Sequence, residues 1–123
     1  MYEAMDYWNK ETLVIPQCET AGCLSHIEEI VSMDGVDGIF IGPFDLSIGL
    51  GIGGQFDSPD FKAALDRIKK ACHDAGKFVI VFTMDPAAAP GYFEEGYDSV
   101  TTGIDTTYYI NACRDAVKTA KSL

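Results

Sequence analysis

Short runs rich in apolar and β-branched residues alternate with longer segments of mixed polarity along this chain. Each short run predicts a β-strand, and each longer segment carries apolar residues three or four positions apart, which predicts a helix. The predicted strands are residues 13–19, 38–41, 78–82 and 99–102. The order of elements is therefore (βα)4.

Glycine and cap residues mark the boundaries of the predicted helices. Gly35, Gly76 and Gly96 each end a helix shortly before the next strand, because glycine readily adopts the left-handed conformation that turns the chain back. Helix starts are predicted at the cap residues Thr20, Ser58, Asp85 and Asp105. We expect residues 1–11 to be a lead-in segment and residues 42–58 to form a glycine-rich loop.

Alternating strands and helices imply a parallel sheet with right-handed crossover connections. Such a sheet is either open and doubly wound, with helices on both faces, or half of a (β/α)8 barrel, with all helices on one side. A complete barrel takes about 250 residues, and this chain has 123. The pattern alone leaves both α/β architectures open, in a single domain over residues 1–123.

The composition is that of an ordinary globular protein, with 47% hydrophobic and 23% charged residues. The net charge of −10 argues against nucleic acid as a partner, because an acidic surface repels phosphate. No apolar run reaches the roughly 18 residues of a membrane span. The first residues lack the basic and apolar regions of a signal peptide. We expect a cytoplasmic protein without a membrane partner.

Two motif-like patterns do not indicate a cofactor. The four cysteines form no C-x-x-C pair and no zinc-ligand spacing with either histidine, so we expect reduced thiols. Residues 49–54 contain G-x-G-x-x-G, but a dinucleotide-binding loop leads directly from a strand into a helix. Here the predicted helix begins only at Pro59, several residues after the motif, which favours an active-site loop over a nucleotide site.

Polar side chains gather where the first two strands end. Alternation along residues 13–19 places Gln17 and Glu19 on one face, at the C-terminal end of the strand. Asp45 follows the next strand, and α/β sheets bind their ligands at this C-terminal rim. Two carboxylates with room for water suit Mg²⁺ or Mn²⁺. The alternative is that both are solvent-facing loop acids, one of them a helix cap.

Two segments carry a family resemblance, VIPQCET at residues 14–20 and GVDGIFIGPFDLS at residues 35–47. They resemble the HpcH/HpaI aldolase family, which belongs to the phosphoenolpyruvate/pyruvate-binding barrel superfamily. GQFDSP at residues 54–59 and TGIDT at residues 102–106 are also similar, so the resemblance extends over residues 13–120. It implies that the chain is the C-terminal half of a TIM-type (β/α)8 barrel, its last four strand–helix units.

The same resemblance implies a metal-dependent lyase. Family members cleave 2-oxo-4-hydroxy acids to pyruvate and an aldehyde, and a divalent ion (Mg²⁺, Mn²⁺ or Co²⁺) acts as a Lewis acid on the pyruvate unit. The family's metal-binding carboxylates fall on Glu19 and Asp45. Its substrate contacts fall on Gln17, on the backbone of Phe44 and Asp45, and on Ser47.

The resemblance also implies what the chain lacks. The family's catalytic histidine and substrate-binding arginine lie upstream of the matched region, so no catalytic residue is expected in this chain. We expect His26, His73, Arg67 and Arg114 at the surface, and little aldolase activity from the chain alone. The alternatives are a non-catalytic truncated paralogue and a flavodoxin-like binding module.

Two kinds of partner are expected. The small-molecule partner is the 2-oxo acid substrate that the resemblance implies. A half barrel also leaves two sheet edges and one apolar sheet face uncovered, so we expect a homo-oligomer, at least a dimer.

Overall fold

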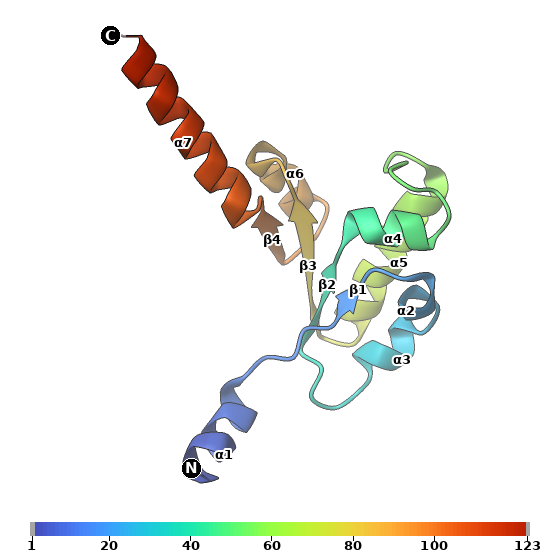
Figure 1. The fold of residues 1–123 in the computed structure, drawn as a ribbon. Helices are drawn as coiled ribbons and strands as arrows, with labels where there is room; N and C mark the ends of the chain where they lie inside the picture. The colour runs from blue at the N-terminus through green and yellow to red at the C-terminus, as the bar shows by residue number, and fades with distance from the viewer. Residues whose placement is uncertain (1, 123) are drawn as a thin grey trace.

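The computed structural model describes residues 2–122 of the 123-residue chain. Its sheet contains strands β1 (Gln17–Cys18), β2 (Gly38–Ile41), β3 (Phe78–Thr83) and β4 (Ser99–Thr102). The strands lie in chain order, and every neighbouring pair is parallel. The helices are α1 (Tyr2–Glu11), α2 (Ala21–Ser25), α3 (Ile27–Val31), α4 (Pro43–Gly49), α5 (Pro59–Asp74), the 3₁₀ helix η1 (Pro86–Ala88), α6 (Ala89–Glu94) and α7 (Asp105–Lys121). The predicted (βα)4 order is confirmed (Figure 1).

The core lies between the sheet and the helices on one of its faces (Figure 1). Ile39 and Ile41 of β2 pair in register with Val79 and Val81 of β3, and all four side chains are fully buried. Phe40, between the two isoleucines, faces the opposite way and is only half-buried. Helices α3 and α5 pack on the buried face with the side chains of Ile27, Val31, Phe61, Ala64, Ile68, Ala71 and Cys72. A one-sided helix layer is the arrangement of a barrel and not of a doubly wound sheet.

Helices α1 and α7 lie outside this core. No described residue of either helix is buried, and α7 runs away from the sheet beyond β4 (Figure 1). The apolar stripe predicted along the last helix is therefore exposed, and Tyr109 is 73% accessible. Within residues 2–122, no helix is both long and apolar enough to cross a membrane.

Two predictions about helices need correction. Residues 42–58, predicted as a loop, contain helix α4, because Pro43 suits the first helical position and Leu46 becomes fully buried. The helix predicted after Thr20 is split into α2 and α3 at His26, whose backbone leaves the helical region with φ −113° and ψ 19°.

The start of the last helix and the extent of the first strand also differ from prediction. Asp105 is the first residue of α7, and the cap position belongs to Ile104. Regular strand pairing is confined to Gln17–Cys18, because Pro16 has no N–H to donate. One hydrogen bond still joins the residue before β1 to β2, because the Phe40 N–H donates to the carbonyl oxygen of Pro16 at 3.0 Å.

The predicted caps at three other helices are confirmed. The Thr20 hydroxyl accepts from the Cys23 N–H at 3.0 Å, and the Ser58 hydroxyl accepts from the Phe61 N–H at 3.2 Å. The Asp85 carboxylate accepts from the Ala87 N–H at 2.9 Å, at the start of η1. These side chains satisfy N–H groups that have no partner within their own helix.

Candidate functional site

Strand β1 ends in a polar pair on the open face of the sheet. Cys18 points into the core and is fully buried, so its neighbour Gln17 points to the opposite face. The Gln17 side-chain amide donates to Oε2 of Glu19 at 2.5 Å. Gln17 therefore fixes one oxygen of the Glu19 carboxylate at the C-terminal rim.

Helix α4 packs against this end of β1 through glycine at both of its ends. A Cβ atom at Gly42 would lie 2.8 Å from Nε2 of Gln17 and 3.3 Å from Oε2 of Glu19. A Cβ atom at Gly49 would lie 3.1 Å from the backbone nitrogen of Ala21 and 3.4 Å from the carbonyl oxygen of Glu19. The two glycines are seven residues apart, two helical turns, and so share one face of α4.

Asp45 lies beside that face. It follows Gly42 by three residues and precedes Gly49 by four, the spacings that bring side chains together along a helix. Asp45 is exposed, whereas Leu46 next to it is fully buried. Helical spacing therefore places Asp45 on the side of α4 that carries these two glycines.

The donor set at this rim is two carboxylates and one amide. Among residues 2–122, no group of three or more His, Cys, Asp or Glu side chains is close enough together to hold a metal ion. A site built on Glu19 and Asp45 therefore leaves the other ligand positions to water or substrate. That ligand set fits Mg²⁺, which keeps several waters and takes one or two carboxylates.

The first turn of α4 presents backbone donors at the same rim. The first hydrogen bond of the helix runs from the Leu46 N–H to the carbonyl oxygen of Gly42 at 2.9 Å. The N–H groups of Phe44 and Asp45 precede it and have no partner within the helix. They are suited to bind a carboxylate.

Ser47 occupies a different environment from these residues. Its side chain is fully buried, its hydroxyl donates to the carbonyl oxygen of Phe44 at 2.6 Å, and it accepts from the Gly54 N–H at 2.9 Å. The hydroxyl thus ties the glycine-rich turn to α4. The sequence alone did not predict that Ser47 would link these two segments, because the contacts form only when residues 43–49 are helical.

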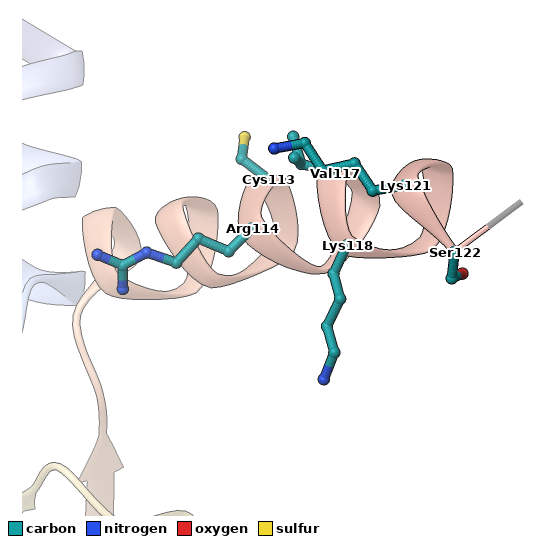
Figure 2. Close-up of a pocket in the computed structure, with 6 residues that line it drawn as sticks. All are labelled: Cys113, Arg114, Val117, Lys118, Lys121 and Ser122. Carbon is teal, nitrogen blue, oxygen red and sulfur yellow. The ribbon is translucent and has the colours of Figure 1, made fainter.

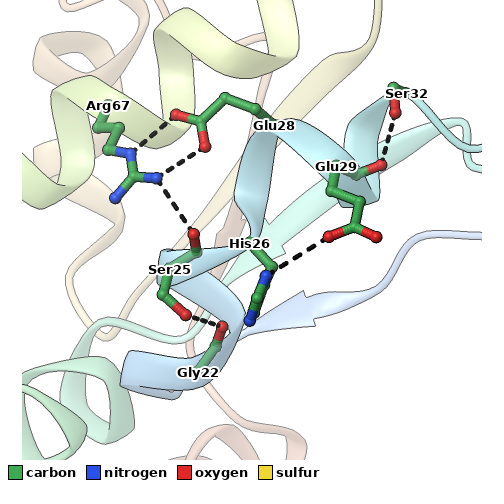
Figure 3. A network of polar contacts seen from close by, with 7 residues as sticks. All are labelled: Gly22, Ser25, His26, Glu28, Glu29, Ser32 and Arg67. Carbon is green, nitrogen blue, oxygen red and sulfur yellow. Dashed lines mark hydrogen bonds and ion pairs between the residues drawn. The ribbon is translucent and has the colours of Figure 1, made fainter.

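The histidines and arginines lie on the helix layer or beyond it, as predicted. Arg67 of α5 donates to both carboxylate oxygens of Glu28 at 2.8 and 2.7 Å (Figure 3). This guanidinium lowers the pKa of Glu28 to about 2. Exposed His26 pairs with Glu29, with 3.4 Å between Nδ1 and Oε2 (Figure 3).

His73 and Arg114 are also exposed at the surface, as predicted. Nε2 of His73 lies 3.3 Å from Oδ2 of Asp98, near the N-terminal end of the sheet. Arg114 extends along the surface of α7 (Figure 2). Within the described chain, neither histidine faces the Glu19 carboxylate.

Two hollows in the surface lie away from the carboxylates. One, of about 570 Å³, is a shallow surface along α7 alone (Figure 2). The other, of about 970 Å³, lies among α4, α5 and α6 and shares only Phe44 with the candidate site. Neither is lined by Glu19 or Asp45, so the carboxylates stand on an open rim rather than in a closed pocket.

Comparison with known proteins identifies the family. The family model for HpcH/HpaI aldolase/citrate lyase matches residues 2–112. The chain belongs to this family. The HpcH/HpaI resemblance predicted from residues 14–20 and 35–47 is thereby confirmed.

Curated members of the HpcH/HpaI family match with about a third of positions identical. The hydroxypyruvate/pyruvate aldolase of Cupriavidus necator is 36% identical over 110 residues, which are 89% of this chain and 41% of the relative. The 4-hydroxy-2-oxo-heptane-1,7-dioate aldolase of Klebsiella pneumoniae is 37% identical over 99 residues, 80% of this chain and 37% of the relative. The chain spans less than half the length of these relatives.

Solved structures of the HpcH/HpaI family have the same fold. The family protein from Burkholderia cenocepacia superimposes with a TM-score of 0.83 and 34% identity, covering 97% of this chain and 46% of that one. The aldolase from Desulfitobacterium hafniense gives a TM-score of 0.80 and 28% identity, covering 99% and 48%. The four strand–helix units thus correspond to about half of a TIM-type barrel, as predicted.

Proposed function

We propose that this chain carries the metal-binding and pyruvate-binding half of a class II aldolase that converts 2-oxo-4-hydroxy acids to pyruvate and an aldehyde. The observation that carries the proposal is the hydrogen-bonded pair of Gln17 and Glu19 packed against the helix that bears Asp45. The names of the related aldolases support the reaction class.

Each residue at the rim has a role that its chemistry suits. Glu19 and Asp45 hold Mg²⁺, Mn²⁺ or Co²⁺ through carboxylate oxygens. When bound, the ion supplies Lewis-acid stabilisation of the negative charge that develops on the pyruvate oxygens. The Gln17 amide and the N–H groups of Phe44 and Asp45 hold and orient the pyruvate unit, with Ser47 keeping the turn around α4 in place.

The proton-transfer step belongs outside this chain. His26 and His73 lie on the helix layer, so within residues 2–122 no histidine is available at the rim. The HpcH/HpaI resemblance implies that the base and an arginine come from the other half of the barrel. We expect the 123-residue domain alone to bind metal and pyruvate with little turnover, which makes a non-catalytic metal-binding paralogue the second candidate.

The open face of the sheet supports self-association. Phe40, Ile80 and Phe82 alternate with the buried residues of their strands and are only half-buried in the described chain, and β1 and β4 are the two edges of its sheet. Apolar faces and unpaired edges drive association in water. We expect at least a dimer by sedimentation at micromolar concentration, and a clean monomer would count against this part of the proposal.

Metal titration tests the site directly. Calorimetry with Mn²⁺ should give measurable binding to the chain, and Glu19→Gln and Asp45→Asn should each weaken it by about tenfold or more. Glu29→Gln is the matched control, because Glu29 is an exposed acid on α3 whose carboxylate pairs with His26. Unchanged affinity in both rim variants would remove the metal site. A pyruvate-release assay completes the test. Ordinary turnover by the isolated chain would contradict the proposal that it carries only half of the active site.

A further inference from the structure

Gly42 stands where strand β2 passes into helix α4, and its missing side chain matters to its neighbours. The residue is buried, and its φ of −95° is open to any amino acid, so its backbone does not require glycine. The neighbouring side chains, however, leave no room for a Cβ atom at Gly42. A Cβ atom at this position would lie only 2.8 Å from Nε2 of Gln17, too close for a carbon and a nitrogen that share no bond.

The effect of replacing glycine by alanine depends on which atoms the added Cβ atom would meet. At Gly38 the obstruction includes the backbone carbonyl oxygen of Phe78, so a side chain there would strain the sheet itself. At Gly42 the nearest obstruction is the tip of the Gln17 side chain, which can rotate away at little cost. The fold can therefore absorb a methyl group at Gly42 by moving the Gln17 amide.

Moving that amide breaks a contact with Glu19. The same Nε2 atom that a Cβ atom would displace donates to Oε2 of Glu19 at 2.5 Å. Oε2 itself would lie 3.3 Å from the added carbon, so the carboxylate is also crowded from the Gly42 side. In the native chain, Gly42 leaves room for Gln17 to hold one carboxylate oxygen and leaves the remaining lone pairs of Glu19 available.

We propose that Gly42 is a positioning residue for the Glu19 carboxylate, acting through the side-chain amide of Gln17. The inference rests on the proposed metal site and adds a second role for Gln17, which orients a metal ligand as well as contacting substrate. Groups that hydrogen-bond to a metal ligand typically change metal affinity about 10- to 100-fold when they are removed. Gly42→Ala should produce a loss in this range although it adds only one methyl group.

A double-mutant cycle separates this mechanism from a general disturbance. Mn²⁺ affinity is measured for the wild type, Gly42→Ala, Gln17→Ala and the double variant. We expect each single change to weaken binding, and Gly42→Ala to have little further effect once the Gln17 amide is gone, because interacting residues are not additive. Gly91→Ala is the control, since a Cβ atom at Gly91 in α6 meets no atom within 4 Å. Additive losses in the double variant would overturn the proposal.

A spectroscopic readout tests the contact without metal. The chain has four side-chain amides, those of Asn9, Gln17, Gln55 and Asn111, so their ¹H–¹⁵N signals can be assigned by single substitutions. We expect the Gln17 signal of the metal-free wild type to be shifted by its bond to Glu19 and to move to the free-amide position in Gly42→Ala. It should stay in place in Gly91→Ala. An unmoved Gln17 signal in folded Gly42→Ala would overturn the inference.

The two readouts distinguish failure of the inference from failure of the proposed function. If the Gln17 signal moves but Glu19→Gln and Asp45→Asn leave Mn²⁺ affinity unchanged, the positioning contact stands and the metal site is wrong. If Gly42→Ala fails to fold by circular dichroism, Gln17→Met replaces it, because methionine keeps the length of the side chain and removes the donor. Wild-type Mn²⁺ affinity in Gln17→Met would then overturn the proposal.

Discussion

Asp37 and Val14 are joined by two hydrogen bonds of opposite direction. The Asp37 N–H donates to the carbonyl oxygen of Val14 at 2.9 Å, and the Val14 N–H donates to the Asp37 carboxylate at 2.7 Å. Asp98 and Val79 repeat the arrangement, at 3.1 and 2.8 Å. Each aspartate lies two residues after a glycine with positive φ that follows a helix. The pairs therefore fix the N-terminal side of the sheet, opposite the rim that bears Glu19.

Removing either carboxylate should loosen the sheet. Asp98→Ala leaves the N–H of Val79, in β3, without its acceptor, and we expect it to lower the free energy of unfolding by about 1–3 kcal/mol. Asp37→Ala removes the acceptor of the Val14 N–H ahead of β1, and we expect a smaller loss because Val14 is exposed to water. Asp34→Ala is the control, because Asp34 is exposed and makes no side-chain hydrogen bond to the part of the chain that the structure describes. Urea denaturation compares the three. Equal effects at Asp34 and Asp37 would contradict the anchoring role.

The pair of Arg67 and Glu28 should make stability depend on pH. Hydrogen bonds from Arg67 lower the pKa of Glu28 from 4.5 to about 2. A carboxyl with a lowered folded-state pKa stabilises the protein fully above 4.5, and this contribution disappears as the pH falls towards 2. We expect wild type and Arg67→Gln to differ in stability at neutral pH and to converge in acid.

Nuclear magnetic resonance titration of Glu28 checks the cause of that difference. In Arg67→Gln the Glu28 carboxyl should titrate closer to 4.5. Arg114→Gln on α7 should leave the Glu28 midpoint where it is in the wild type, because Arg114 lies on the surface of another helix. A Glu28 midpoint that is the same with and without Arg67 would rule the pair out as its cause.

The hydroxyl group of Tyr97 is buried without a hydrogen-bond partner among the described residues. The Tyr97 ring packs edge-on against Tyr92 at 5.5 Å and lies 4.9 Å from Nζ of Lys69. Because a buried unpaired polar group is costly, Tyr97→Phe should raise the free energy of unfolding by about 1 kcal/mol. Thermal denaturation measures the change. A clear loss of stability in Tyr97→Phe, compared with Tyr92→Phe, would show that the hydroxyl is satisfied.

The thiols should differ sharply in reactivity. Cys18 and Cys72 are fully buried, whereas Cys113 lies exposed on α7. Burial, with a smaller effect of the Asp98 charge, raises the pKa of Cys72 to about 11, so its thiol stays protonated at mildly alkaline pH. Iodoacetamide followed by peptide mass spectrometry should find Cys113 labelled first. Cys72 should react only in urea, and early labelling of Cys72 would indicate local opening of α5.

Local patterns explain most of what the sequence predicted correctly about the fold. Residues 38–41 and 99–102 match β2 and β4, because short apolar or β-branched runs between glycines have few other conformations open to them. Ser58 caps α5 as predicted, since the cap contact spans only three residues. Helix α4 was missed because its seven residues include Pro43 and Gly49, and its formation depends on burying Leu46 in a core assembled from distant segments.

The sequence could name the candidate site residues but not their contacts. Strand order and alternation alone indicated that Gln17, Glu19 and Asp45 belong to one rim. The bond from Gln17 to Glu19 and the space that Gly42 leaves for it depend on the register of β1 against β2. A single sequence specifies such a register only through the whole folded sheet, so neither contact could be inferred beforehand.

The order of the strands has a consequence for how the chain reaches this structure. Each strand pairs only with strands that are its neighbours in the sequence. Closing the loop between consecutive strands costs less entropy than joining strands far apart in the chain, because the cost grows with loop length. The sheet can therefore grow one strand–helix unit at a time, in the direction of synthesis, with β1 and β2 able to pair before β4 has left the ribosome.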